Sequence, residues 1–109
     1  MYVVMKRLEI SASHKLKLSY KSKCENLHGH NWIIYIYLKS DKLDENSMVY
    51  DFTDIKKSVM EKLDHKNLNS VINQPTAENI AKFICDEIGQ KCFKVKVQES
   101  EGNVAIYER

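Results

Sequence analysis

Strand-like alternation of hydrophobic and polar residues occurs near both ends of the chain. Residues 2–12 alternate loosely, and residues 93–98 and 104–108 alternate on either side of a turn at 101–103. We therefore expect an opening strand and a C-terminal hairpin. Residues 31–39 are dense in β-branched and aromatic side chains. They predict a further strand, apolar on both faces, so that both faces are expected to be covered.

Two helical patterns lie between these strands. The first has apolar residues at three- and four-residue spacing: Phe52, Ile55, Val59 and Leu63. The second runs from Thr76, which can cap its N-terminus, to Ile88, and Gly89 follows as a stop signal. The order β-β-α-α-β-β predicts one α+β domain over residues 1–109, with two helices on one face of an antiparallel four-stranded sheet. The other face carries apolar side chains with no helix to cover it, which predicts self-association.

The composition narrows the class of protein. The 109 residues carry 17 Lys and Arg against 15 Asp and Glu, a net charge of +2, which argues against a basic nucleic-acid-binding surface. No uncharged apolar run approaches the roughly 18 residues of a membrane span, and no apolar run of the kind found in signal peptides follows Met1. The three cysteines have no paired spacing, so a reducing compartment is expected. We therefore expect a cytoplasmic protein without membrane or nucleic-acid partners.

Three of the four histidines are placed for metal binding. His28 and His30 flank Gly29, and in an extended segment their imidazoles point to the same side. His14 stands where the first strand should end, so it meets this pair if the two strands run antiparallel. Three imidazoles with one open position describe a catalytic zinc site, and nickel, cobalt or iron would also bind one. The alternative is three surface histidines in and beside the polar segment 15–29.

A thiol and three carboxylates complete the candidate chemistry. Cys24 precedes the histidine pair by four residues and would lie beside the metal, where positive charge favours the thiolate. Alternatively, Cys24 is a fourth ligand that closes a structural Cys-His₃ site. Asp64 can set the tautomer or charge of His65 if the two touch, but a histidine near a helix end needs no chemistry. By themselves, Glu78 and Glu99 are ordinary solvated acids.

The motifs that hold these residues form a longer pattern. Residues 24–32 (CENLHGHNW) contain a cysteine, three residues, His-Gly-His and an aromatic. This segment resembles the 6-pyruvoyl-tetrahydropterin synthase / 6-carboxytetrahydropterin synthase family. Further segments match that family in order across nearly the whole chain: residues 13–16, 50–52, 63–69, 74–79 and 97–99. The chain departs from the family at Gln74, where Asn is usual, in the shorter loop 17–23 and in the turn 100–103.

The resemblance implies a fold, an assembly and a metal. The fold is the T-fold, a β-β-α-α-β-β unit. Three units close into a barrel, and two trimers usually stack as a hexamer. The active site forms where subunits meet. The implied cofactor is Zn²⁺, bound by His14, His28 and His30.

The resemblance also implies catalytic and substrate-binding roles. Cys24 corresponds to the catalytic proton acceptor, and His65 corresponds to the charge-relay histidine with Asp64 beside it. Glu99 corresponds to the residue that anchors the pterin ring, and it is sometimes grouped with the relay. Two further residues match positions near the pterin: Thr76 and Glu78.

The implied substrate is 7,8-dihydroneopterin triphosphate. The compact chain and the segment 74–79 look more like the 6-carboxy branch of the family. The implied enzyme is then a lyase, 6-carboxy-5,6,7,8-tetrahydropterin synthase, whose products are 6-carboxytetrahydropterin, acetaldehyde and triphosphate, on the route to the queuosine base. The alternative within the family is 6-pyruvoyl-tetrahydropterin synthase. Alternatives of other classes are a non-catalytic zinc-binding oligomer with a Cys-His₃ site and a nucleic-acid binder that uses the lysines of residues 15–23.

Overall fold

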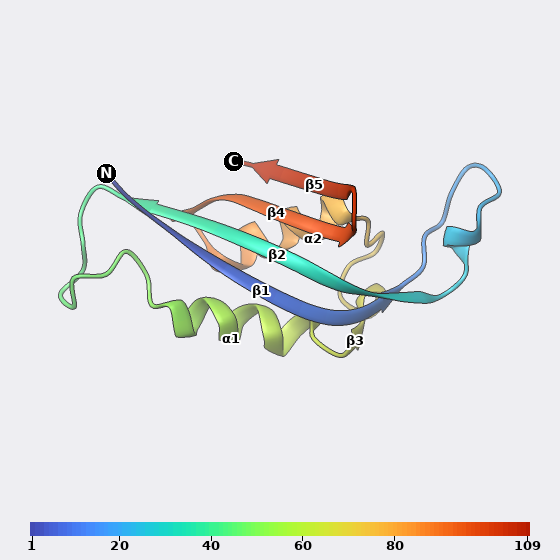
Figure 1. The fold of residues 1–109 in the computed structure, drawn as a ribbon, viewed down its shortest axis with the longest axis horizontal. Helices are drawn as coiled ribbons and strands as arrows, with labels where there is room; N and C mark the ends of the chain where they lie inside the picture. The colour runs from blue at the N-terminus through green and yellow to red at the C-terminus, as the bar shows by residue number, and fades with distance from the viewer.

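Two long strands dominate the structure, a computed structural model that describes residues 1–109 (Figure 1). β1 (Tyr2–His14) and β2 (His28–Ser40) pair antiparallel over their whole lengths. β4 (Cys92–Ser100) pairs antiparallel with the other edge of β2, and β5 (Asn103–Glu108) pairs antiparallel with β4. The predicted opening strand, central strand and C-terminal hairpin are confirmed, and β2 begins at His28, three residues before the predicted start at residue 31.

A fifth strand makes the sheet mixed. β3 (Lys66–Asn67) pairs parallel with β1 at Ala12 and Ser13, which gives the order β3-β1-β2-β4-β5. The prediction of an antiparallel four-stranded sheet is therefore wrong in this strand. The chain turns back at His65, whose φ is 57°, and the His65 N–H donates to the Ser11 carbonyl at 2.7 Å. Two residues carry no hydrophobic period, so alternation cannot reveal a strand this short.

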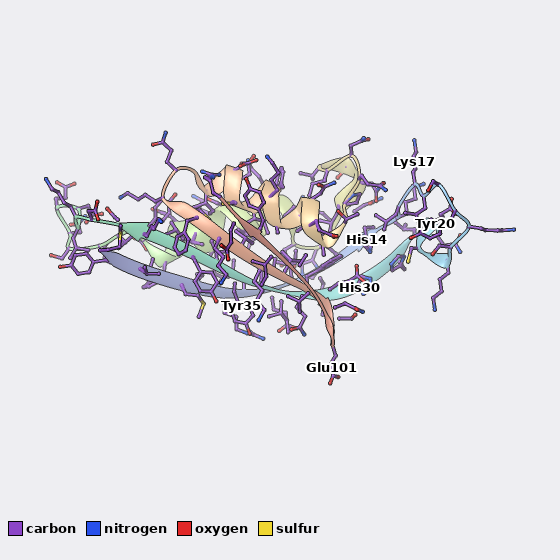
Figure 2. All side chains as sticks on the ribbon, turned by 90° about the horizontal axis from the view of Figure 1, so that it is seen from above. His14, Lys17, Tyr20, His30, Tyr35 and Glu101 are labelled. Atoms are coloured by element: carbon purple, nitrogen blue, oxygen red, sulfur yellow. The ribbon has the colours of Figure 1, made fainter.

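Both helices pack on one face of the sheet, as predicted (Figure 2). α1 (Phe52–Leu63) and α2 (Ala77–Ile88) each begin after a residue whose side chain accepts a free backbone N–H, Asp51 for α1 and Thr76 for α2. Phe52 departs from the expected apolar stripe of α1, because it is the first residue of the helix and its side chain stays exposed. The rest of that stripe is buried, as are five residues of α2.

The core lies between the sheet and the helices. Alternate residues of β2 fill its centre and are fully buried: Trp32, Ile34, Ile36 and Leu38. The opposite face of β2 carries Ile33, Tyr35 and Tyr37, which are only half-buried in the single chain. Figure 2 shows Tyr35 on the side of the sheet away from the helices. Within a single chain the elements therefore cover only the core face of this strand, and coverage of the other face stays a prediction.

One end of the sheet extends beyond the helices (Figure 1). There β1 and β2 are joined by residues 15–27, which include a short 3₁₀ helix (Lys23–Glu25). A second 3₁₀ helix (Leu68–Ser70) follows β3 at the same end. No helix of the structure is both long enough and apolar enough to cross a membrane.

Candidate active site

Strand register brings the three predicted metal histidines together. In the β1–β2 ladder His14 lies directly opposite His28, and His30 is two residues further along the same face of β2. Their ring nitrogens form a group in which the potential ligand atoms all lie within 4.8 Å of one another. Figure 2 shows His14 and His30 near the end of the sheet, where the loop that carries Lys17 and Tyr20 begins. The predicted antiparallel pairing is the reason that this cluster forms.

Hydrogen bonds to backbone carbonyls fix which nitrogen is free in the rings of His14 and His28. His14 Nδ1 lies 2.7 Å from the Pro75 carbonyl oxygen, and His28 Nδ1 lies 2.7 Å from the Asn26 carbonyl oxygen. A carbonyl only accepts, so in the neutral rings both Nδ1 atoms carry the proton and both Nε2 atoms present lone pairs. These two Nε2 atoms lie 3.1 Å apart. His30 Nε2 is buried with no hydrogen-bond partner.

This donor set fits a metal ion. The Nε2 lone pairs of His14 and His28 face each other without a shared proton and repel one another, and a cation between them removes that repulsion. The same cation would give the buried His30 Nε2 a partner. The side chain of His14 is 1% exposed, and burial lowers its pKa, an effect that the neighbouring His28 reinforces. A lowered pKa keeps the imidazole neutral, which is the form that binds metals. These residues could therefore hold a metal, and imidazole nitrogen alone suits several.

The buried ring of Trp32 packs against the histidine cluster from the core. It lies edge-on to the rings of His14 and His30, with centroid distances of 4.9 Å and 5.1 Å. Its Nε1–H donates to the Ala12 carbonyl at 3.1 Å. The sequence motif includes Trp32, but its role as a buried support for two ligands is visible only in the structure. The same is true of the Pro75 carbonyl that orients His14.

Cys24 and Glu99 border the histidine cluster. Both line a cavity of about 470 Å³ together with His28 and His30. The Glu99 carboxylate reaches toward the cluster, with Oε2 3.9 Å from His14 Nε2 and Oε1 3.8 Å from His30 Nε2. Cys24 is outside the group whose ligand atoms lie within 4.8 Å of one another. The thiol therefore lies beside the histidines in this chain and is not a member of their cluster.

The 3₁₀ helix that bears Cys24 is held by a capping box. The Ser22 hydroxyl accepts the Cys24 N–H at 3.1 Å, and the Glu25 carboxylate accepts the Ser22 N–H at 3.3 Å. Cys24 is partly exposed, whereas Cys85 and Cys92 are buried in the core. Burial raises the pKa of Cys92 to about 12, so its thiol stays protonated and unreactive near neutral pH.

Asp64 and His65 touch each other, and His65 lines a different cavity from that of Cys24. Asp64 Oδ2 is 3.5 Å from His65 Nε2, and Asp64 Oδ1 accepts the Ser11 N–H at 3.0 Å. His65 is largely exposed and lines a cavity of about 530 Å³ that includes His30 and excludes Cys24. A single chain therefore brings His65 to one side of the histidine cluster and Cys24 to another.

The two remaining predicted residues line a third cavity. Thr76 and Glu78 border about 340 Å³ of space beside α2, and Glu99 and Asn103 border both this cavity and that of Cys24. Thr76 also caps α2 by accepting the Asn79 N–H at 3.1 Å. Glu99 thus connects the space next to the histidine cluster with the space next to Thr76.

Known proteins share this sequence and architecture. The profile of the family described as 6-pyruvoyl tetrahydropterin synthase matches residues 3–109. The chain belongs to this family. It is 33% identical to a 6-pyruvoyl tetrahydrobiopterin synthase of Dictyostelium discoideum, over 96% of this chain and 95% of the relative. It is 32% identical to a 6-carboxy-5,6,7,8-tetrahydropterin synthase of Rickettsia felis, over 94% of this chain and 91% of the relative.

A solved structure of the family has the same fold. The 6-pyruvoyl tetrahydropterin synthase of Caenorhabditis elegans superposes with a TM-score of 0.79 at 25% identity, covering 99% of this chain and 95% of that one. The resemblance noted in the sequence motifs is thereby confirmed. The family contains enzymes named for both the 6-pyruvoyl and the 6-carboxy product.

Proposed function

We propose that this protein is a zinc-dependent 6-carboxy-5,6,7,8-tetrahydropterin synthase. It would convert 7,8-dihydroneopterin triphosphate and water to 6-carboxytetrahydropterin, acetaldehyde and triphosphate, as a cytoplasmic lyase on the route to queuosine-type bases. The observation that carries the proposal is the convergence of His14, His28 and His30, with His30 Nε2 left without a partner, beside a cavity that Cys24 and Glu99 line. We prefer the 6-carboxy branch because the compact chain and the segment 74–79 look more like that branch of the family.

His14, His28 and His30 would hold the zinc through Nε2. When bound, zinc supplies Lewis-acid polarisation of the side-chain hydroxyls of the substrate. Cys24, as a thiolate, would take a proton from the substrate carbon that bears such a hydroxyl. A well-placed acid–base group typically raises the reaction rate by about 10²–10⁴-fold. Glu99 would accept hydrogen bonds from the N–H groups at the amino-pyrimidine edge of the substrate. It would thereby hold the pterin ring so that the substrate's own side chain lies over the histidines.

His65 would serve as the second proton-transfer group, steadied by Asp64. Because Cys24 and His65 line different cavities of one chain, a complete site needs His65 from a second copy. The half-buried face of Ile33, Tyr35 and Tyr37 supports assembly, since it has no helix to cover it. We therefore include a homo-oligomer, a trimer or a hexamer built as a barrel, in the proposal.

The decisive experiment is mass spectrometry of the products after zinc-loaded protein is incubated with 7,8-dihydroneopterin triphosphate. We expect 6-carboxytetrahydropterin with acetaldehyde. A 6-pyruvoyl product would keep the site and refute the choice of branch. Absence of turnover by a zinc-loaded oligomer would refute catalysis. Tyr20→Phe, an exposed change away from the histidine cluster, is the matched control and should turn over like the wild type.

The role of Cys24 is tested by zinc content. Cys24→Ala should retain one zinc per chain and lose turnover, because the thiol acts on the substrate and three histidines still hold the metal. Loss of zinc in Cys24→Ala, with His65→Ala still loaded, would instead assign Cys24 as a fourth ligand of a Cys-His₃ site.

Subunit sharing is tested by mixing inactive variants. Cys24→Ala and His65→Ala, dissociated and reassembled together, should regain activity, because some interfaces then combine an intact thiol with an intact histidine. Wild-type protein that is dissociated and reassembled in the same way must recover its activity. If it does and the mixed variants stay inactive, both residues of each site come from the same chain.

A further inference from the structure

Residues 15–17 run in an extended path from the end of β1 and are held by two side-chain amides. The Lys15 N–H donates to Asn69 Oδ1 at 2.8 Å, and Asn69 Nδ2 donates to the Lys15 carbonyl at 2.9 Å. Gln74 binds Lys17 in the same two-pronged way, at 3.0 Å to the N–H and 2.7 Å to the carbonyl. Each amide thus replaces a neighbouring strand and satisfies both backbone groups of one residue.

The opposite edge of the same segment holds Cys24. The Leu16 N–H donates to the Cys24 carbonyl at 3.0 Å. Backbone groups of successive residues in an extended chain point to opposite edges, so Lys15 and Lys17 face the amides while Leu16 faces the cysteine. Residues 15–17 therefore form a strut between the two amides and the 3₁₀ helix of Cys24.

Hydrogen bonds also connect the Gln74–Pro75 segment to the start of α2 and to the histidine cluster. The Gln74 carbonyl accepts the Thr76 N–H at 2.8 Å and Asn79 Nδ2 at 2.8 Å, which ties it to the start of α2. The next residue, Pro75, is buried and its carbonyl accepts the His14 Nδ1–H at 2.7 Å. One short segment thus orients a metal ligand through its backbone and the cysteine loop through a side chain.

We propose that Gln74 is a positioning residue that sets where the Cys24 thiol lies relative to the three histidines. It acts through the backbone of Lys17 and Leu16 and touches no reacting group. An Asn side chain at this position would be one methylene shorter than Gln74. The longer side chain reaches the Lys17 backbone along the path that this loop takes. The catalytic consequence rests on the proposed function, whereas the placement of the thiol is measurable without any turnover.

The test is the rate at which iodoacetamide alkylates Cys24 in metal-free, folded protein. The other two thiols are buried, so the native reaction reports Cys24. Loss of both hydrogen bonds in Gln74→Ala should free the loop and raise the rate roughly tenfold. Gln74→Glu keeps an acceptor for the Lys17 N–H but loses the donor to its carbonyl, so its rate should be intermediate. The control is Gln90→Ala, an exposed glutamine, which should react like the wild type.

An alkylation rate for Gln74→Ala equal to that of the wild type would overturn the proposal. If Gln74→Ala does not fold, the same comparison with Gln74→Glu decides. Zinc content should stay at the wild-type value in both variants, because the bond that orients His14 comes from the Pro75 backbone. In turnover, kcat should fall about tenfold or more while KM changes by less than about twofold. A wild-type protein that shows no turnover would refute the proposed function and leave the alkylation result to decide the role of Gln74.

Discussion

Replacing Trp32 by Phe should weaken the fold and the metal cluster together. Trp32 is fully buried, donates to the Ala12 carbonyl at 3.1 Å and lies edge-on to His14 and His30 at 4.9 Å and 5.1 Å. Phe keeps an aromatic ring at this position but lacks the N–H donor and the second ring. The variant therefore removes one hydrogen bond and part of the surface on which two histidines rest.

The expected loss in the free energy of unfolding is about 3 kcal/mol. The hydrogen bond contributes about 1 kcal/mol net. The smaller ring leaves a void of about 40 Å³, which costs about 1 kcal/mol at roughly 24 cal/mol per Å³. Phe also buries less apolar surface on folding than Trp does, and this difference adds about another 1 kcal/mol to the loss. Loss of support for the histidines should also weaken zinc binding about tenfold, the usual effect of removing groups that hold ligands.

The assay is urea unfolding of metal-free protein followed by circular dichroism, at one fixed protein concentration. Tryptophan fluorescence cannot follow the variant, since Trp32 is the only tryptophan. Tyr20→Phe is the control, because Tyr20 is 67% exposed and should change stability by less than about 0.5 kcal/mol. A loss below about 1 kcal/mol for Trp32→Phe, with unchanged m-value and zinc affinity, would refute the packing argument.

Four further predictions follow from the contacts. Gly29→Ala should leave the fold stable to within about 0.5 kcal/mol by thermal denaturation, because a Cβ there meets nothing closer than the Ala12 carbonyl at 3.7 Å; a larger loss would contradict that open space. Native protein should expose one of its three thiols to Ellman's reagent at pH 7.5 and all three in guanidinium; two or three fast thiols in the native protein would show that Cys85 or Cys92 is accessible. Cu²⁺ should quench Trp32 fluorescence in the wild type and much less in His14→Ala, and equal quenching would mean that copper binds elsewhere. The hydrogen bond from Lys82 lowers the pKa of Asp86, so the stability that Asp86 adds is present above the ordinary carboxyl pKa and is lost as the pH falls through the lowered one; Asp86→Asn should flatten that loss in acid unfolding curves, and an unchanged curve would contradict it.

Local patterns along the chain were sufficient to predict most elements and the convergence of the three histidines. Alternation located β1, β4 and β5, the density of β-branched and aromatic residues located β2, and the capping residue Thr76 located the start of α2. The spacing His-x-His set two imidazoles on one face of a strand, and antiparallel pairing brought His14 to them. These features depend on the regular periods of helices and strands, so a single sequence contains the information.

Contacts between distant segments decided the rest. The strand β3 arises because His65 takes a left-handed conformation and binds Ser11, a pairing across 54 positions that leaves no periodic signal. The separation of Cys24 and His65 into different cavities likewise depends on how the sheet end and the loops pack. The amide of Gln74 stands out in the sequence only as a departure from the family pattern, and its two bonds to Lys17 exist because the segment before α2 meets the loop in space. Sequence periods determine which face a residue occupies, whereas side-chain hydrogen bonds between remote segments depend on distances that only the packed tertiary structure sets.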